Sequence, residues 1–112
     1  MTSRLRLLAV VFIGALAALF FWAPWNNTNP LDEGKRIFLT VSEPNCAICH
    51  RLRDAGAAGE VGPDLDSLKP DQARVKAAVT NGIGAMPAFE ALSSEQIDAV
   101  SLYVSTAAGR KK

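Results

Sequence analysis

Cysteine and histidine are scarce in this chain of 112 residues, which has two cysteines and one histidine. All three lie together as Cys46, Cys49 and His50, in the stretch PNCAICH. One copy of the chain therefore cannot supply the four Cys or His ligands that are usual for structural zinc. A zinc site would need a second copy of the chain or carboxylate ligands.

A redox dithiol of the thioredoxin type is a second interpretation of the two cysteines. That motif normally begins a helix after a strand, in a chain where strands and helices alternate. Little of this sequence has the alternation of apolar and polar residues that predicts strands. The interpretation also gives the histidine after the second cysteine no role.

Covalent attachment of haem is the third interpretation, and it uses all three residues. Two thiols at the spacing of Cys46 and Cys49 can form thioethers with the two vinyl groups of a haem, while His50 binds the iron. A motif this short also arises by chance. The rest of the chain has to decide between the interpretations.

An uncharged apolar run occupies residues 7–25 and follows two arginines. As a helix it would be about 28 Å long, close to the thickness of the hydrocarbon core of a bilayer. Positive residues favour the cytoplasmic side, so we expect the N-terminus in the cytoplasm and the rest of the chain in the periplasm.

A cleaved signal peptide is the alternative interpretation of the same run. Cleavable signals end in a small-x-small site, whereas this run ends in Trp22, Pro24 and Trp25. We therefore expect residues 1–25 to be an uncleaved, single-pass membrane anchor. The alternative is a soluble periplasmic protein after signal cleavage. Residues 26–30 would form a short tether, and residues 31–112 one domain.

Three segments of that domain have helical patterns. Residues 32–39 begin with two acidic residues, and Gly34 interrupts the pattern, which suggests close approach of another helix. Residues 69–82 place Pro70 and Asp71 in a first turn and end at Asn-Gly. Residues 93–109 begin with a capping box of Ser93 and Gln96.

The connections between these helices are long and rich in glycine and proline, and no segment convincingly predicts a strand. We therefore predict an all-α domain. Long connections are unusual in a small domain unless something fills the space between them. A haem would fill that space.

The second axial ligand of such a haem can be narrowed by composition. No second histidine exists, and Met86 is the only methionine besides Met1. Met86 lies in the stretch IGAMPAF, where Pro87 can stiffen the loop. A thioether ligand favours ferrous iron and closes it to small ligands. A methionine that merely fills a gap in the core is the alternative.

Residues 32–108 resemble the small monohaem c-type cytochromes of the mitochondrial and bacterial class, and most of all the short photosynthetic and bacterial electron shuttles. The matching features are Gly34 and Phe38, then CAICH, VGPDL, NGIGAMPAF and LSSEQIDAVSLYV, in this order. The resemblance implies a small cytochrome c fold of about three to four helices around one haem c.

The resemblance also implies roles for individual residues. Cys46 and Cys49 would hold the haem, His50 and Met86 would bind the iron, and Pro63 would accept a hydrogen bond from His50. Tyr103 would pack near Gly34. The sequence departs from the family in having Ser101 where a small apolar residue is commoner, and in offering no obvious residue for the haem propionates.

The expected function is one-electron transfer between respiratory or photosynthetic redox proteins, such as a membrane reductase, an oxidase or a reaction centre. Nucleic acid and small-molecule substrates are not expected partners. A fixed haem subunit of a membrane oxidoreductase is the main alternative, and a gas or redox sensor is another. A peroxidase would need an open iron position and a distal His or Arg, and no distal histidine is available.

The charge of the domain does not indicate which surface binds the redox partner. From Asn26 onward the formal charge is −1, and no basic face is evident. We therefore predict transient docking through an apolar surface around the haem edge. The residues expected there are Ala47, Ile48, Ile83, Ala85 and Pro87.

Overall fold

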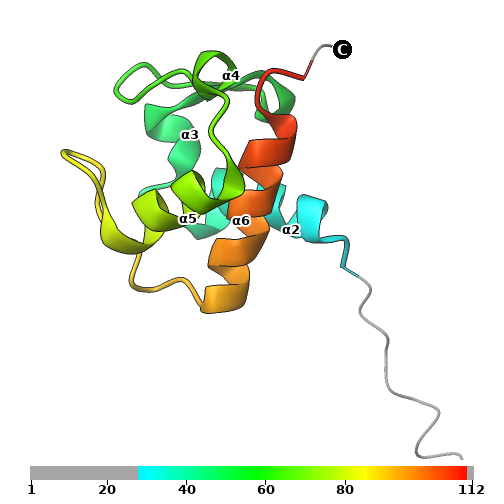
Figure 1. Cartoon of the computed structure of the whole chain (residues 1–112), viewed down its shortest axis with the longest axis vertical. Helices are drawn as coiled ribbons and strands as arrows, with labels where there is room; N and C mark the ends of the chain where they lie inside the picture. Colours follow the sequence, from blue (N-terminus) through cyan, green and yellow to red (C-terminus); the bar gives the residue numbers. More distant parts are fainter. Residues whose placement is uncertain (1–27, 111–112) are drawn as a thin grey trace, which may run out of the picture.

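The computed structural model describes residues 28–110 (Figure 1). The expected membrane anchor lies outside this range. Within it, no helix is both long and apolar enough to cross a bilayer.

The first described helix is α2 (Pro30–Arg36), which continues into the π-helical segment η1 (Ile37–Val41). Asn29 caps α2 by accepting a hydrogen bond from the backbone N–H of Leu31 over 3.0 Å. Proline suits the first position of a helix, because its missing N–H would have no partner there. The helix therefore begins at Pro30, inside the stretch expected to be tether.

The two other long helices are α5 (Gln72–Asn81) and α6 (Ser94–Ala107). The capping box of α6 is confirmed: Ser93 Oγ accepts from the N–H of Gln96, and Gln96 Oε1 accepts from the N–H of Ser93. Asp71, expected within the first turn of α5, instead caps that helix and accepts from the N–H of Arg74 over 2.7 Å.

Helices α2 and α6 cross at Gly34, which is buried. A Cβ atom at this position would overlap the carbonyl oxygen of Ala99 and lie 2.5 Å from Cβ of Tyr103. The expected close approach of a second helix is therefore present, with Tyr103 at the crossing. The ring of Tyr103 also meets the ring of Phe38 edge-on, with centroids 6.1 Å apart.

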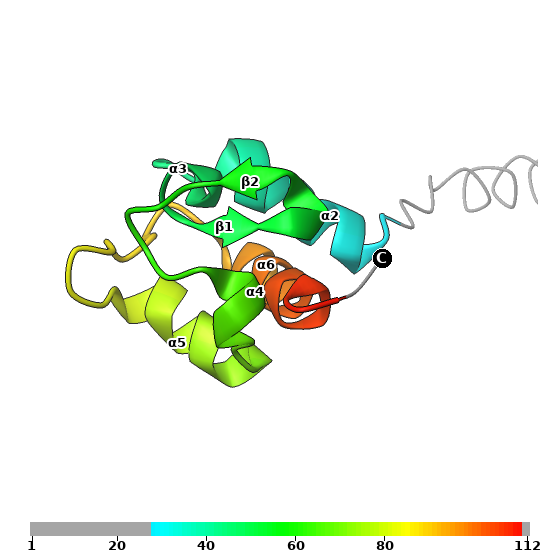
Figure 2. The same ribbon diagram turned by 90° about the horizontal axis from the view of Figure 1, so that it is seen from above.

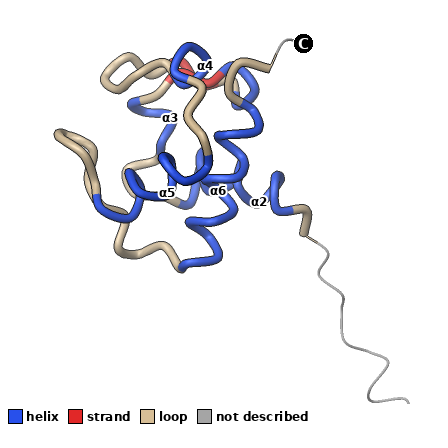
Figure 3. The backbone as a smooth tube through the Cα atoms, in the orientation of Figure 1, coloured by secondary structure: helices blue, strands red, loops and turns tan. Residues whose placement is uncertain are grey.

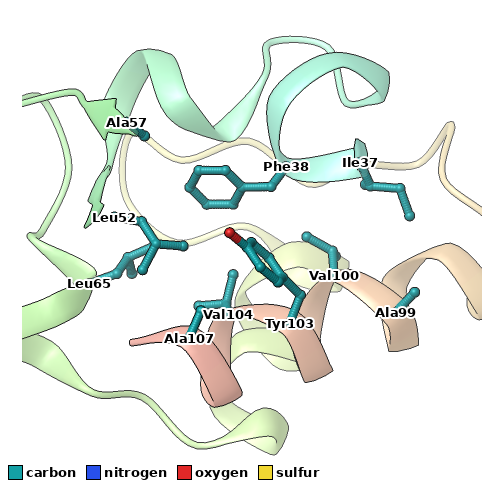
Figure 4. Close-up of a cluster of buried hydrophobic side chains, with 10 residues drawn as sticks. All are labelled: Ile37, Phe38, Leu52, Ala57, Leu65, Ala99, Val100, Tyr103, Val104 and Ala107. Atoms are coloured by element: carbon teal, nitrogen blue, oxygen red, sulfur yellow. The ribbon is translucent and has the colours of Figure 1, made fainter. Parts of the chain in front are cut away.

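The core lies between these helices and the segment that follows α3 (Cys46–Cys49) (Figure 4). Its buried apolar members are Ile37, Phe38, Leu52, Ala57, Leu65, Ala99, Val100, Tyr103, Val104 and Ala107. Ser101 is also fully buried, and its hydroxyl donates to the carbonyl oxygen of Ile97 over 2.6 Å. This bond satisfies the polar group, so serine is tolerated at a site where an apolar residue is commoner.

The segments expected to be loops contain short regular elements (Figures 2 and 3). β1 (Arg51–Leu52) pairs antiparallel with β2 (Ala57–Ala58), and the 3-10 turn η2 (Arg53–Ala55) joins them. The single-turn helices α3 (Cys46–Cys49) and α4 (Leu65–Leu68) flank this ladder. Residues 28–110 thus contain five α-helices instead of three to four, and a small ladder where no strand was predicted.

Candidate functional site

An apolar cavity of about 700 Å³ lies between α3, α5 and the loop that follows α5. Cofactor and ligand pockets typically measure roughly 300–1,000 Å³, so the space suits a large organic group. The five residues singled out from the sequence all line it: Cys46, Cys49, His50, Pro63 and Met86. Among all the lining side chains, those with nitrogen or oxygen atoms are Asn45, His50, Arg74 and Asn81.

The two cysteines lie at the two ends of α3 and are both free thiols. Burial raises the pKa of the Cys46 thiol, while a contact with Ser42 opposes the increase. The Ser42 Oγ atom lies 3.4 Å from Cys46 Sγ and 3.1 Å from the carbonyl oxygen of Ile37. Ser42 therefore supports Cys46 from inside the core. Sequence reasoning missed this residue.

The backbone and the side chain of His50 are each held by a backbone carbonyl oxygen. The backbone N–H of His50 donates to the carbonyl oxygen of Cys46 over 2.9 Å, which closes the turn of α3. Its Nδ1 atom lies 2.8 Å from the carbonyl oxygen of Pro63, the contact that the resemblance implied. A carbonyl oxygen can only accept, so the proton sits on Nδ1. The lone pair of Nε2 is then free to bind a metal ion.

Two glycines that sequence reasoning did not single out allow the chain to fold closely around His50. A Cβ atom on Gly62 would lie 2.6 Å from Cε1 of the His50 ring. A Cβ atom on Gly59 would lie 2.6 Å from the backbone N of His50. Both glycines lie in the stretch GEVGP, which ends at Pro63. This pair of glycines was the signal in the sequence for a close approach to His50.

Met86 lies in a tight turn after α5. The backbone N–H groups of Ile83 and Met86 each donate to the other residue's carbonyl oxygen, and both bonds are 3.0 Å long. Gly84 lies inside this turn with a φ of 56°, a conformation that other residues adopt only with strain. Met86 thus lines the cavity from a loop that is stabilised by its own hydrogen bonds.

The structure also tests the zinc site that was considered from the sequence. Within residues 28–110, no cluster of three or more His, Cys, Asp or Glu could hold a metal ion. Carboxylates of the described part therefore do not complete a zinc site around the cysteines. A thiol pair, an imidazole nitrogen and a thioether around one apolar cavity instead match the attachment points and axial ligands of a haem.

Three comparisons with known proteins point the same way. Residues 29–104 match the family model described as cytochrome C oxidase, cbb3-type, subunit III. Cytochrome c6 of Leptolyngbya boryana is 41% identical over 69 residues, which cover 57% of this chain and 81% of the cyanobacterial protein. The crystal structure of the c-type cytochrome SorU from Sinorhizobium meliloti shares 63% identity with a TM-score of 0.72, and the match covers 73% of this chain and 94% of SorU.

Proposed function

Because the chain belongs to this family of small monohaem c-type cytochromes, and so carries one covalently attached haem c, we propose that it is a one-electron carrier with His50 and Met86 as axial iron ligands. Cys46 and Cys49 would hold the haem through thioethers. When bound, the haem supplies a one-electron couple between ferrous and ferric iron.

The residues of the chain adjust that couple. The carbonyl oxygen of Pro63 holds the Nδ1 proton of His50 and so fixes the orientation and basicity of the ring. The apolar walls exclude water, which disfavours the more highly charged ferric state. A thioether from Met86 favours the ferrous state as well.

The observation that carries the proposal is the position of Met86. It lines the same cavity as His50 and is held there by the two hydrogen bonds with Ile83. A closed iron site suits electron transfer, whereas a peroxidase or a gas sensor needs a position that opens. A redox titration followed by visible spectroscopy tests this. We expect a single one-electron transition, with low-spin spectra in both redox states. A high-spin ferric or ferrous spectrum would contradict the proposed ligand pair.

We further propose that the protein acts on the periplasmic side of the cytoplasmic membrane, anchored by residues 1–25, and exchanges electrons with respiratory or photosynthetic proteins. The uncharged run and the absence of a small-x-small site at its end support the anchor. The intact mass of the mature protein tests it. A chain that retains residues 7–25 is expected, and a chain that begins near Asn26 would show a cleaved signal.

A fixed haem subunit of a membrane oxidoreductase is the second candidate. The observation that favours it is the matched family model, whose description names an oxidase subunit. Purification from detergent-solubilised membranes separates the two candidates. A carrier is expected to purify alone, while a subunit would purify with a complex in fixed stoichiometry.

A further inference from the structure

Among the side chains of residues 28–110 that line the apolar cavity, Arg74 is the only cationic one. It lies in the first turn of α5, where Asp71 fixes its backbone N–H. Within residues 28–110, its guanidinium makes no ion pair or hydrogen bond with another side chain. Arg74 is also exposed to solvent, so its guanidinium is free to bind an anionic group that lies at the edge of the cavity.

Other charged groups close to Arg74 in the chain are those of Asp64, Lys69, Asp71 and Lys76. The side chain of Lys69 lies against Gly109, where an added Cβ would meet its Cε at 2.5 Å. Lys76 forms an ion pair with Asp98 over 2.5 Å. The carboxylates of Asp64 and Asp71 accept hydrogen bonds from backbone N–H groups at the starts of α4 and α5. None of these groups lines the cavity.

The haem that the family carries has two propionate carboxylates, on the side of the macrocycle away from the vinyl groups. A carboxylate against an apolar wall loses hydration and needs a partner to stay ionised. Asn45 adjoins Cys46, at the edge where the thioethers form, and an asparagine supplies no charge. An arginine fork instead matches the geometry and the charge of a carboxylate.

We propose that the guanidinium of Arg74 binds a propionate carboxylate of the haem. The proposal assigns a residue to the haem propionates, for which the sequence offered no obvious candidate. The inference rests on the haem c of the family and on no particular electron donor or acceptor, so it can fail while the carrier function stands.

The pairing has a consequence for the reduction potential. The positive charge of Arg74 balances the ionised propionate, so the carboxylate stays ionised across the neutral range. Without the guanidinium, the ionised carboxylate would stabilise ferric iron and lower the potential. The pKa of the propionate would also rise, so the potential would become pH-dependent.

The test is a redox titration of the haem-loaded protein over a pH series from about 5 to about 8, the range into which a poorly solvated carboxyl can be shifted. We expect a nearly constant potential for the wild type. We expect Arg74→Gln to have a lower potential near neutral pH, which falls further as pH rises through the shifted propionate pKa. Arg74→Lys should lie between the two, because it keeps the charge and loses the fork.

Lys76→Gln is the matched control, because it removes the same charge from the same helix at a residue outside the cavity lining. Its Lys76–Asp98 pair is half exposed on both sides, so its loss should matter little. The proposal predicts that this variant titrates like the wild type. Equal titration curves for Arg74→Gln and Lys76→Gln would overturn it. If Arg74→Gln does not load haem, Arg74→Lys provides the test instead. A titration curve identical to that of the wild type, with an unchanged low-spin spectrum, would then contradict a contact that needs the arginine fork.

Discussion

The hydroxyl of Tyr103 donates a hydrogen bond to Oδ2 of Asp54 over 2.7 Å, and so joins α6 to the segment that follows His50. Lys35 of α2 adds a second tie, because its Nζ donates to the carbonyl oxygen of Asp54 over 2.7 Å. The hydrogen bond from Tyr103 lowers the pKa of the Asp54 carboxyl. Burial and the Asp54 carboxylate raise the pKa of Tyr103. Three segments far apart in the sequence are held together here.

Tyr103→Phe should lower the free energy of unfolding at neutral pH by about 1.5–3 kcal/mol, the range for a hydrogen bond to a charged group. The Asp54 pKa is lower in the folded than in the unfolded state. Its stabilisation is therefore present above the unperturbed Asp pKa and is lost as pH falls through the lowered folded-state pKa. The difference between variant and wild type should accordingly shrink in acid.

Denaturant unfolding at neutral pH and at about pH 3 measures this difference. The lower of these two pH values lies below the unperturbed Asp pKa. Ser105→Ala is the control, because the Ser105 hydroxyl donates only to a backbone carbonyl oxygen of the same helix. Its effect should be small and independent of pH. A Tyr103→Phe deficit of the same size at both pH values would show that lost packing, and not the bond to Asp54, is responsible.

Gly34→Ala tests the crossing of α2 and α6. An exposed helical glycine normally gains about 1 kcal/mol of stability on replacement by alanine. At Gly34 the new Cβ would overlap Ala99 and Tyr103, so we expect a loss of about 1–3 kcal/mol instead. Chemical denaturation gives the sign directly. A stabilised variant would mean that the two helices are further apart than described.

The helix ends were predictable because their signals are local. Each signal acts within a few residues of the chain: Ser93 with Gln96 begins α6, and Gly82 after Asn81 ends α5, as the sequence predicted. The pairing of β1 with β2 was not predictable, because two-residue strands carry no periodicity. Ser42, Gly59 and Gly62 were missed for a related reason. Their roles depend on contacts with other segments, which are visible only once the chain is folded.

Gly62→Ala should disturb His50, the proposed iron ligand, without affecting the cysteines. Its Cβ would press on the His50 ring at 2.6 Å and move Nδ1 away from the Pro63 carbonyl oxygen. We expect a smaller low-spin fraction and a shifted reduction potential. Gly56→Ala is the control, because a Cβ there meets nothing within 4 Å although the positive φ adds strain. That variant should lose stability and keep the wild-type spectrum. Matching spectra for all three proteins would contradict the role of Gly62.

Exposed apolar side chains, including Ile83 of the cavity lining, provide a test of partner docking. Ile83 is 69% exposed and Ile48 is 58% exposed. Exposed apolar side chains that gather in one patch can mark a protein-binding surface. We expect Ile83→Lys to slow electron transfer to the physiological partner while the haem spectrum stays unchanged. Ala73→Lys adds the same charge on an exposed part of α5 outside the cavity lining and should have little effect.

The salt dependence of the wild-type rate separates apolar docking from electrostatic steering. A near-neutral apolar contact should give rates that change little between low and moderate ionic strength. Rates that fall steeply as salt is added would contradict apolar docking and point to a charged docking surface.

Carbon monoxide binding to the ferrous protein tests the central claim, that Met86 closes the iron site of an electron carrier. Carbon monoxide needs a free position on ferrous iron, so the visible spectrum of the wild type should not change when the gas is added. Met86→Ala should bind it readily and should have a lower reduction potential, because the thioether that favours ferrous iron is gone. Ready binding by the wild type would contradict the assignment of Met86 and, with it, the carrier function.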